Sequence, residues 1–217
     1  MTKAELKEIA EQLRCPSGSA GIEMAEVMHK TNIGMTLASI EALGIQDQQA
    51  ILELGPGNCG HLSTIMQKAK DMTYVGLEVS ETMQRAAEQG NQTWVAEQRV
   101  TFKCYDGQTI PYPDHTFDRI MTVNTLYFWQ SPSELLLELY RVLRVRGRLV
   151  LTFATKQFME KLPFVTHNFR LYDHQELNYL INQSPFRLSD ILDKTEQVKS
   201  KAGDWVERSY SVAMLEK

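Results

Sequence analysis

The sequence predicts one α/β domain in which a mostly parallel β-sheet is covered by helices on both faces. From residue 45 onward, segments with strand character alternate with segments of helical periodicity. Several of these strands are continuously apolar, as strands of a doubly covered sheet are. A glycine-rich turn separates the first strand from the first helix of that region. Two β-rich segments on a short connection close the chain, which predicts an antiparallel pair at the end of the sheet.

The first 44 residues are predicted to form a helical cap that precedes the sheet. Their apolar residues recur at helical spacing, Pro16-Ser17-Gly18 separates a first helix from the rest, and Gly44 ends the region. We expect a second break near Asn32, with residues 33–43 packed on the outer helices of the sheet. The apolar side chains that should be buried are Ile22, Met24, Val27, Met28, Ile33, Met35, Leu37 and Ile40.

The remaining elements follow from short apolar runs and helical periods. Strands are expected at 50–54, 73–77, 100–103, 117–123, 148–153, 186–197 and 205–215, and helices at 61–70, 80–90, 132–143 and 173–182. Ser80 is placed to cap its helix, with Glu81 in the first turn. No repeat or linker divides the chain, so residues 1–217 are predicted to be a single domain, with a cap at 1–44 and a core at 45–217.

Composition excludes several classes of protein. The 217 residues are 43% hydrophobic and 23% charged with a net charge of −4, which is typical of a globular domain and offers no basic excess to nucleic acid or an anionic membrane. Cys15, Cys59 and Cys104 lack CxxC spacing, so we expect reduced thiols and no metal site. No apolar run approaches the roughly 20 residues of a membrane span, and the charged N-terminus lacks the features of a signal peptide. We expect a cytoplasmic protein.

A cofactor site is predicted where the first strand ends. Glu53-Leu54-Gly55-Pro56-Gly57-Asn58-Cys59-Gly60 follows a strand and opens a helix. Glycines there let a cofactor approach the backbone, and a helix N-terminus offers free amides and partial positive charge. Glu78 ends the second strand 18 residues past the last glycine. That spacing is close to the ~20 residues expected for a carboxylate that binds ribose hydroxyls.

Two cofactors fit these features, a nicotinamide dinucleotide and S-adenosylmethionine. Three observations favour the second. Glu53 lies inside the loop motif, and Pro56 stiffens a turn that would have to lie against a pyrophosphate in a dinucleotide site. The terminal antiparallel pair is also unexpected in the nicotinamide-binding fold.

Five motifs stand in order along residues 45–217. They are Ile51-Leu52-Glu53-Leu54-Gly55-Pro56-Gly57, Val75-Gly76-Leu77-Glu78-Val79-Ser80, Tyr105-Asp106-Gly107, Phe117-Asp118-Arg119-Ile120 and Val142-Leu143-Arg144-Val145-Arg146-Gly147-Arg148-Leu149. The chain thereby resembles the class I S-adenosylmethionine-dependent methyltransferases, especially the group similar to the ubiquinone/menaquinone C-methyltransferases. The resemblance implies a Rossmann-like, seven-stranded and mostly parallel sheet whose last strand lies antiparallel beside the fifth.

The resemblance also implies how the methionine end of the cofactor would be held. Gly55, Pro56 and Gly57 would pass beneath the methionine moiety, and Glu53 would help to orient its amino end. Asn124, just past the fourth strand, would face the amino group through its carbonyl.

At the adenosine end, the resemblance implies that Glu78 holds the ribose and that Val79 and Met83 flank the adenine ring. Asp106 would accept a hydrogen bond from the adenine amino group, with the Gly107 amide at the ring edge. Two positions depart from the family pattern. Cys59 replaces the third loop glycine, and Arg146-Gly147 replaces a glycine pair, where we expect only a surface turn.

Aromatic residues follow Asn124 at the carboxyl edge of the sheet. Tyr127 is predicted to contact the cofactor, with Phe128 and Trp129 nearby as wall or core. An aromatic face near the sulfonium would contribute roughly 0.5–2 kcal/mol. Methyl transfer in this family has no universal catalytic residue, so the sequence leaves the catalytic group unknown.

Other polar residues carry weaker signals. His29 and His167 are candidate bases, although plain structural histidines remain the simpler reading. Asp173-His174 with Glu176 superficially resembles a pair of metal ligands, but these residues are more typical of the start of a helix. Asp118 is expected to bond to backbone at the strand entry.

The expected function is methyl transfer from S-adenosylmethionine to a small-molecule acceptor, by a monomer or homodimer. A non-catalytic S-adenosylmethionine-binding protein and a nicotinamide-dependent oxidoreductase remain alternatives. We further expect residues 1–32 to form a lid over the cofactor that excludes water, the alternative being helices that merely cap the sheet.

Overall fold

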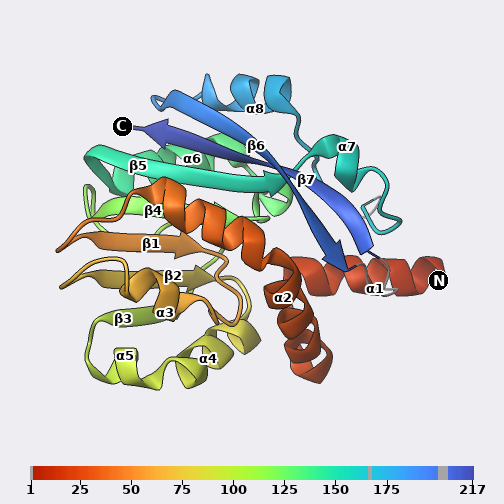
Figure 1. Cartoon of the computed structure of the whole chain (residues 1–217), viewed down its shortest axis with the longest axis horizontal. Coiled ribbons are helices and arrows are strands. Elements are labelled where there is room, and N and C mark those ends of the chain that lie inside the picture. The colour runs from red at the N-terminus through yellow and green to blue at the C-terminus, as the bar shows by residue number, and fades with distance from the viewer. Residues whose placement is uncertain (1, 166–167, 200–204) are drawn as a thin grey trace.

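The computed structural model describes residues 2–165, 168–199 and 205–217 as a sheet between two layers of helices (Figure 1). The elements in chain order are α1 (Lys3–Arg14), α2 (Gly18–Leu43), β1 (Ala50–Leu54), α3 (Leu62–Met66), β2 (Thr73–Glu78), α4 (Glu81–Gly90), α5 (Gln92–Ala96), β3 (Val100–Cys104), β4 (Phe117–Val123), the 3-10 turn η1 (Leu126–Phe128), α6 (Pro132–Val142), β5 (Leu143–Ala154), α7 (Lys156–Met159), α8 (His174–Ile181), β6 (Arg187–Lys199) and β7 (Trp205–Glu216).

The sheet has seven strands in the order β3-β2-β1-β4-β5-β7-β6. Parallel pairing joins β1 to β2 and β4, β2 to β3, and β4 to β5. β7 runs antiparallel to both β5 and β6. This confirms the predicted mostly parallel sheet with an antiparallel last strand beside the fifth. The strand order reverses between β1 and β4, and ligands of open α/β sheets bind at such a point, outside the carboxyl ends of the strands.

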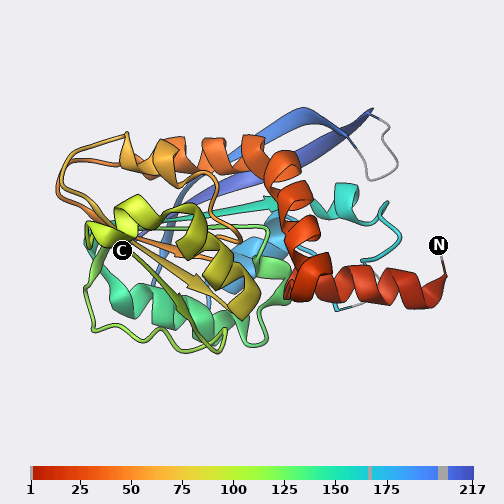
Figure 2. The ribbon, with the colours of Figure 1, turned by 90° about the horizontal axis from the view of Figure 1, so that it is seen from below.

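Burial explains why these segments are strands and helices. The central strands β1 and β4 carry fully buried side chains such as Ile51, Leu52 and Ile120, because helices cover both of their faces. Figure 2 shows α2 along one side of the sheet and α6 along the other. α6 turns Leu135 and Leu139 inward, and burial of each leucine side chain stabilises the fold by about 1.5–3 kcal/mol. Helices on both faces were predicted and are confirmed.

α2 differs from the prediction of two helices. It runs unbroken from Gly18 to Leu43, although its two halves point in different directions (Figures 1 and 2). Near the bend, Thr31 Oγ1 donates to the carbonyls of Val27 and Met28. Hydroxyl bonding of this kind bends a helix without breaking it. The polar cluster at residues 29–32 is therefore a bend and not the predicted break.

Three of the apolar α2 residues expected to be buried are exposed instead. Ile22, Val27 and Leu37 keep 48%, 42% and 43% of their surface accessible, whereas Met35 and Ile40 are buried. The reason is geometric, since one face of the second half of α2 packs on β4, β5 and β7 while the first half leaves the sheet.

Other boundaries shifted by a few residues. α3 ends at Met66 and not at Lys70, because the chain turns back toward β2, with the Lys70 amide donating to Asp47 and its carbonyl accepting from Gln48. The short α5 was not predicted.

β5 begins at Leu143, so Arg146-Gly147 is part of a strand and not the expected surface turn. Gly147 is buried there, and a Cβ on it would lie 2.6 Å from Leu143. Residues 200–204 of the predicted connection lie outside the described residues.

Candidate functional site

A cavity of about 510 Å³ lies at the carboxyl edge of the sheet. Its floor comes from the turns after β1, β2, β3 and β4, and its roof comes from α1, α2 and the turn between them. In Figure 1 the arrowheads of β1 and β2 point toward the side where α1 and the first half of α2 lie. Every predicted cofactor residue lines this cavity except Tyr127: Glu53, Gly55, Pro56, Gly57, Glu78, Val79, Met83, Asp106, Gly107 and Asn124.

The glycine-rich loop takes a conformation that favours glycine at two positions. Gly55 and Gly57 have φ angles of 66° and 60°. A Cβ on Gly55 would lie 2.5 Å from the Thr125 methyl group, so the loop can lie against the turn after β4 only without a side chain there. A Cβ on Gly57 would meet nothing within 4 Å. Since Gly57 lines the cavity, that open space is where a ligand could lie directly on the backbone.

Glu78 is held at the end of β2 by three backbone amides. One carboxylate oxygen accepts from Gly57 at 3.0 Å, and the other accepts from Val79 at 2.8 Å and Ser80 at 3.2 Å. Burial raises the pKa of Glu78, and these amide bonds oppose the shift. A carboxylate has about four acceptor positions, so the amides fix its orientation and still leave capacity for a ligand hydroxyl.

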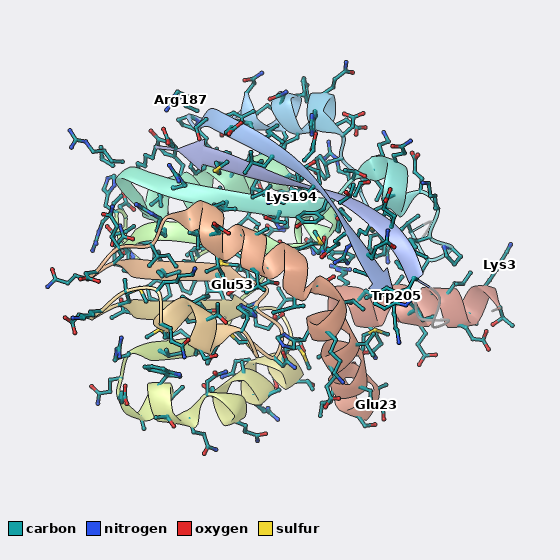
Figure 3. All side chains as sticks on the ribbon, viewed as in Figure 1. Lys3, Glu23, Glu53, Arg187, Lys194 and Trp205 are labelled. Atoms are coloured by element: carbon teal, nitrogen blue, oxygen red, sulfur yellow. The ribbon has the colours of Figure 1, made fainter. Side chains whose placement is uncertain are left out.

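Glu53 lies in the interior beneath the loop, whereas Lys3 and Glu23 lie at the periphery (Figure 3). The Glu53 carboxylate accepts a hydrogen bond from the Tyr74 hydroxyl at 2.7 Å and lies 2.9 Å from Nε2 of His61. Burial opposes charge on His61, but the carboxylate charge and hydrogen bond outweigh it and raise the His61 pKa. Glu53 thus joins β1, β2 and the start of α3 in one buried polar cluster, which the sequence did not predict.

Cys59 occupies the position of the missing loop glycine in the left-handed conformation, with a φ of 49°. Its thiol is fully buried and lies 3.2 Å from the Tyr74 hydroxyl. Burial raises the pKa of Cys59 well above its usual value, which keeps the thiol protonated. The side chain therefore fills a space in the core below the loop rather than facing the cavity.

The turns after β2 and β3 form an apolar slot. Val79 is 40% exposed, although it is a large apolar residue, and a Cβ on Gly107 would lie 3.4 Å from its Cγ1. Met83 is fully buried behind them at the N-terminal turn of α4. Asp106 uses one oxygen to accept from the amides of Gln108 and Thr109, and these bonds lower its pKa.

Tyr127 does not line the cavity. Its buried hydroxyl lies 3.0 Å from both the Ala154 carbonyl and Oδ1 of Asn124. Burial raises the Tyr127 pKa, which keeps this hydroxyl a donor. Phe128 and Trp129 line the cavity in its place, because the 3-10 turn η1 directs Tyr127 inward. Asn124 stays at the edge with a φ of 57°, its side chain held by Tyr127 and the Ala154 amide.

The turn between α1 and α2 docks on the junction of β2 and α4. The Ser80 hydroxyl donates to the Pro16 carbonyl, and the Cys15 thiol lies 3.8 Å from the Val79 carbonyl. Ser80 also caps α4 by accepting from the Met83 amide, as predicted. The N-terminal helices therefore cover the same residues that were predicted to bind adenosine.

Met28, His29, Asn32 and Thr36 line the cavity from α2. Sequence reasoning placed residues 1–32 over the cofactor as a lid and named His29 as a candidate base, but it missed Met28, Asn32 and Thr36 as cavity residues. No sequence signal could have found these three residues, because only the bend of α2 decides which of its faces meets the sheet edge. His167, one of the two candidate bases, lies outside the described residues.

Two smaller predictions can be compared directly with the structure. Asp118 accepts from the Ala50 amide at 2.9 Å, which confirms a structural role at the strand entry. Asp173 and Glu176 form a capping box at the start of α8, which confirms a helix start.

One group of residues has the composition of a metal site. Within the described residues, the ligand atoms of Glu53, Cys59 and His61 lie within 4.8 Å of one another. This donor set suits a borderline ion such as zinc. Each of these atoms already contacts a partner inside the Glu53 and Tyr74 cluster, and the absence of a bound metal stays a prediction.

Comparison with known proteins is consistent with this geometry. A family model described as "Methyltransferase domain" matches residues 52–151. The chain is 25% identical over 201 residues to a demethylmenaquinone methyltransferase of Tropheryma whipplei strain Twist, covering 89% of this chain and 78% of that protein. It is 26% identical over 133 residues to the uncharacterized methyltransferase YdaC of Bacillus subtilis strain 168, covering 60% and 70%.

Solved structures share the fold at low sequence identity. The [4+2]-cyclase SpnF matches with a TM-score of 0.67 at 18% identity over 86% of this chain and 81% of that chain. A SAM dependent methyltransferase from Aquifex aeolicus matches with a TM-score of 0.61 at 18% identity over 99% and 98%. A geranyl diphosphate methyltransferase in complex with GPP and sinefungin matches with a TM-score of 0.69 at 11% identity over 87% and 79%. Among the described helices of this chain, none is both long and apolar enough to span a bilayer.

Proposed function

The chain has the ordered motifs and the fold of the class I S-adenosylmethionine-dependent methyltransferases, and on that premise we propose that it transfers a methyl group from S-adenosylmethionine to a small-molecule acceptor. One observation carries the proposal. The residues that the resemblance assigns to the cofactor converge, apart from Tyr127, on one cavity at the point where the strand order reverses. The names of two relatives, a demethylmenaquinone methyltransferase and a 27-O-demethylrifamycin SV methyltransferase, support a small-molecule acceptor.

The residues of the cavity fit this cofactor. Gly57 leaves open space over its Cα for the methionine end, and Glu78 keeps acceptor capacity for a ribose diol. Val79 and Gly107 offer an apolar slot for the adenine ring. When bound, S-adenosylmethionine would supply a methyl group on a positively charged sulfur.

The chain's own contribution is placement and exclusion of water. Holding an acceptor close to the methyl group can supply about 7–11 kcal/mol of the barrier reduction. The roof of α1 and α2 closes the cavity over the loop, and Phe128 and Trp129 add an aromatic wall on the side of β4. Aromatic faces near a cation contribute roughly 0.5–2 kcal/mol.

Glu78 is the residue whose loss should weaken cofactor binding most clearly. We predict that Glu78→Ala lowers the affinity for S-adenosylmethionine by about 10–100-fold, since one or two charge-assisted hydrogen bonds are lost. Isothermal titration calorimetry measures this directly. The matched control is Glu81→Ala, because Glu81 is exposed on α4 and pairs with Arg85 outside the cavity. Equal affinities for wild type and Glu78→Ala would remove Glu78 from the site.

A second experiment separates the alternatives. Radioactive methyl transfer from S-adenosylmethionine into pooled small metabolites, with protein and RNA pools as controls, tests for turnover. Binding without transfer to any pool would favour a non-catalytic S-adenosylmethionine-binding protein or a different chemistry, since the [4+2]-cyclase SpnF shares the fold. Binding of NADH in preference to S-adenosylmethionine would favour an oxidoreductase. The cytoplasmic location and the monomeric or homodimeric state stay predictions.

A further inference from the structure

His29 is a cavity residue to which the resemblance assigns no role toward the cofactor. It lies on the first half of α2, half-buried, and lines the cavity together with Glu53 and His61. A Cβ on Gly60 would lie 3.0 Å from both Cε1 and Nε2 of its ring. Gly60 therefore leaves the space that the imidazole occupies, which gives the last glycine of the loop a role that the cofactor does not require.

The ring of His29 is available to a ligand. No hydrogen bond to its nitrogens occurs within the part of the chain that the structure describes, and its contact is a stacked arrangement with His61, with ring centroids 6.4 Å apart and planes 18° apart. Among the described residues, the other carboxylates and the other imidazole of the cavity have partners. Glu53, Glu78 and Asp106 accept hydrogen bonds, His61 pairs with the Glu53 carboxylate, and Glu11 pairs with Lys7. His29 is thus the imidazole of the cavity that has no hydrogen-bond partner among the described residues.

Burial and the neighbouring charges favour the neutral form of His29. Burial lowers its pKa, and the nearby charges of His61 and Lys30 lower it further. His61 faces it from the start of α3, with Glu53 of β1 behind His61 raising the His61 pKa. The two histidines are therefore pushed apart in pKa, one toward the neutral base and one toward the cation. Such a divergence is the arrangement that distinguishes acids from bases in enzyme sites.

We propose that His29 is a general base and that the methyl acceptor carries its proton on oxygen or nitrogen. This inference rests on the proposed function. The acceptor lone pair forms the new bond to the methyl carbon, the bond between that carbon and the sulfonium breaks, and its electrons neutralise the sulfur. The acceptor proton moves to a ring nitrogen of His29, and the imidazolium then returns it to solvent. An acceptor without an acidic proton would not need this residue.

The first test reads the ring itself. Nitrogen-15 NMR of histidine-labelled protein, assigned with His29→Asn and His61→Gln, should show a neutral His29 at pH 7 that titrates below 6.5. The same spectra should show His61 titrating above 6.5. A His29 ring that is protonated at pH 7 would overturn the proposal, whether or not any acceptor is known.

The second test uses acceptors of defined chemistry. A panel of phenols and primary amines supplies protic nucleophiles, and iodide supplies a nucleophile with no proton to lose. His29→Asn should slow transfer to the protic acceptors at least 100-fold in kcat and change transfer to iodide less than threefold. His174→Asn, on α8 outside the cavity, is the matched control.

The outcomes distinguish this inference from the proposed function. Equal slowing of protic and proton-free acceptors by His29→Asn would mark His29 as structural and overturn the inference. Wild-type transfer confined to iodide, or to no member of the panel while calorimetry shows S-adenosylmethionine binding, would also overturn it. Absence of S-adenosylmethionine binding would instead remove the proposed function.

Discussion

The two glycines at the start of the glycine-rich loop differ in what their Cα atoms face. Gly55 faces the Thr125 methyl group, whereas Gly57 faces open space in the cavity. Thr125 cannot simply rotate away, because its hydroxyl pairs with Thr122 and accepts from the Trp129 indole. The two glycines have similar φ angles, so they form a matched pair for substitution.

We predict that Gly55→Ala and Gly57→Ala separate stability from binding. Each substitution should lower the free energy of unfolding by about 1–2 kcal/mol, because it places an alanine in the left-handed region. Gly55→Ala should lower the free energy of unfolding by about 1–3 kcal/mol more, because its Cβ would overlap the Thr125 side chain. Gly57→Ala should instead weaken S-adenosylmethionine binding. Chemical denaturation and calorimetry measure the two effects, and equal losses of stability would contradict the assignment.

The pair of His61 and Glu53 should make stability depend on pH. The folded pKa of His61 is raised above its unfolded value of 6.5. The contribution of the pair to stability is then fully present below pH 6.5 and is lost as pH rises through the raised folded value. We predict that His61→Gln destabilises the protein by about 1–2 kcal/mol more at pH 6 than at pH 9.

Denaturation at both pH values measures this difference. In a Glu53→Gln background the pH-dependent part of the His61→Gln effect should disappear, since the charge partner is gone. A difference between pH 6 and pH 9 that persists in that background would assign the effect to another group.

At the scale of elements, the hairpin of β6 and β7 holds α2 at its bend. Arg208 on β7 donates to the Thr31 carbonyl at 2.5 Å, to Asn32 at 2.8 Å and to Glu196 on β6 at 2.6 Å. Its side chain is 7% exposed. A Cβ on Gly34 would lie 1.9 Å from Glu196, so glycine there lets the hairpin approach the helix. The bend that places His29 over the cavity is therefore fixed by the far end of the chain.

We predict that Arg208→Ala costs about 3–5 kcal/mol of stability, because it leaves the Glu196 carboxylate and the Thr31 carbonyl without their partner. Hydrogen exchange of residues 18–32 should accelerate with it. Arg187→Ala is the matched control, since Arg187 pairs with Glu216 on the same hairpin but is 70% exposed and should contribute at most about 1 kcal/mol. A similar small loss for both variants would show that the contact does not fix the helix.

At the scale of the whole molecule, the cap and the core meet at the cavity. The turn between α1 and α2 bonds to the junction of β2 and α4, while the second half of α2 packs on the sheet. The first half of α2 therefore lies between two anchors, at Pro16 and at Arg208. This is the arrangement of a lid that closes over a ligand, and its closing motion stays a prediction.

We predict that S-adenosylhomocysteine slows hydrogen exchange at residues 24–32 as well as at residues 55–60. A ligand that contacts both the floor and the roof orders both, whereas helices that only cap the sheet would not respond. Exchange mass spectrometry with and without ligand measures this. Protection confined to residues 55–60 would contradict the lid.

The sequence by itself determined the sheet and the glycine-rich loop, because both depend on local signals. The apolar runs of the central strands, the Ser80 cap and the glycines after β1 are encoded within a few residues of where they act. Ten of the eleven predicted cofactor residues could be placed at one cavity for the same reason, since the carboxyl ends of parallel strands share one edge.

Only the tertiary structure decided the rest, because it depends on residues that are distant in the chain. The Tyr127 side chain points inward, where its hydroxyl donates to the Ala154 carbonyl 27 residues away. The Glu53 carboxylate contacts His61 and Tyr74. Arg208 donates to the carbonyl of Thr31, which lies 177 positions earlier in the chain. No local periodicity encodes such contacts. They form only when the sheet has brought its edges together, and they determine which face of α2 carries His29 to the cavity.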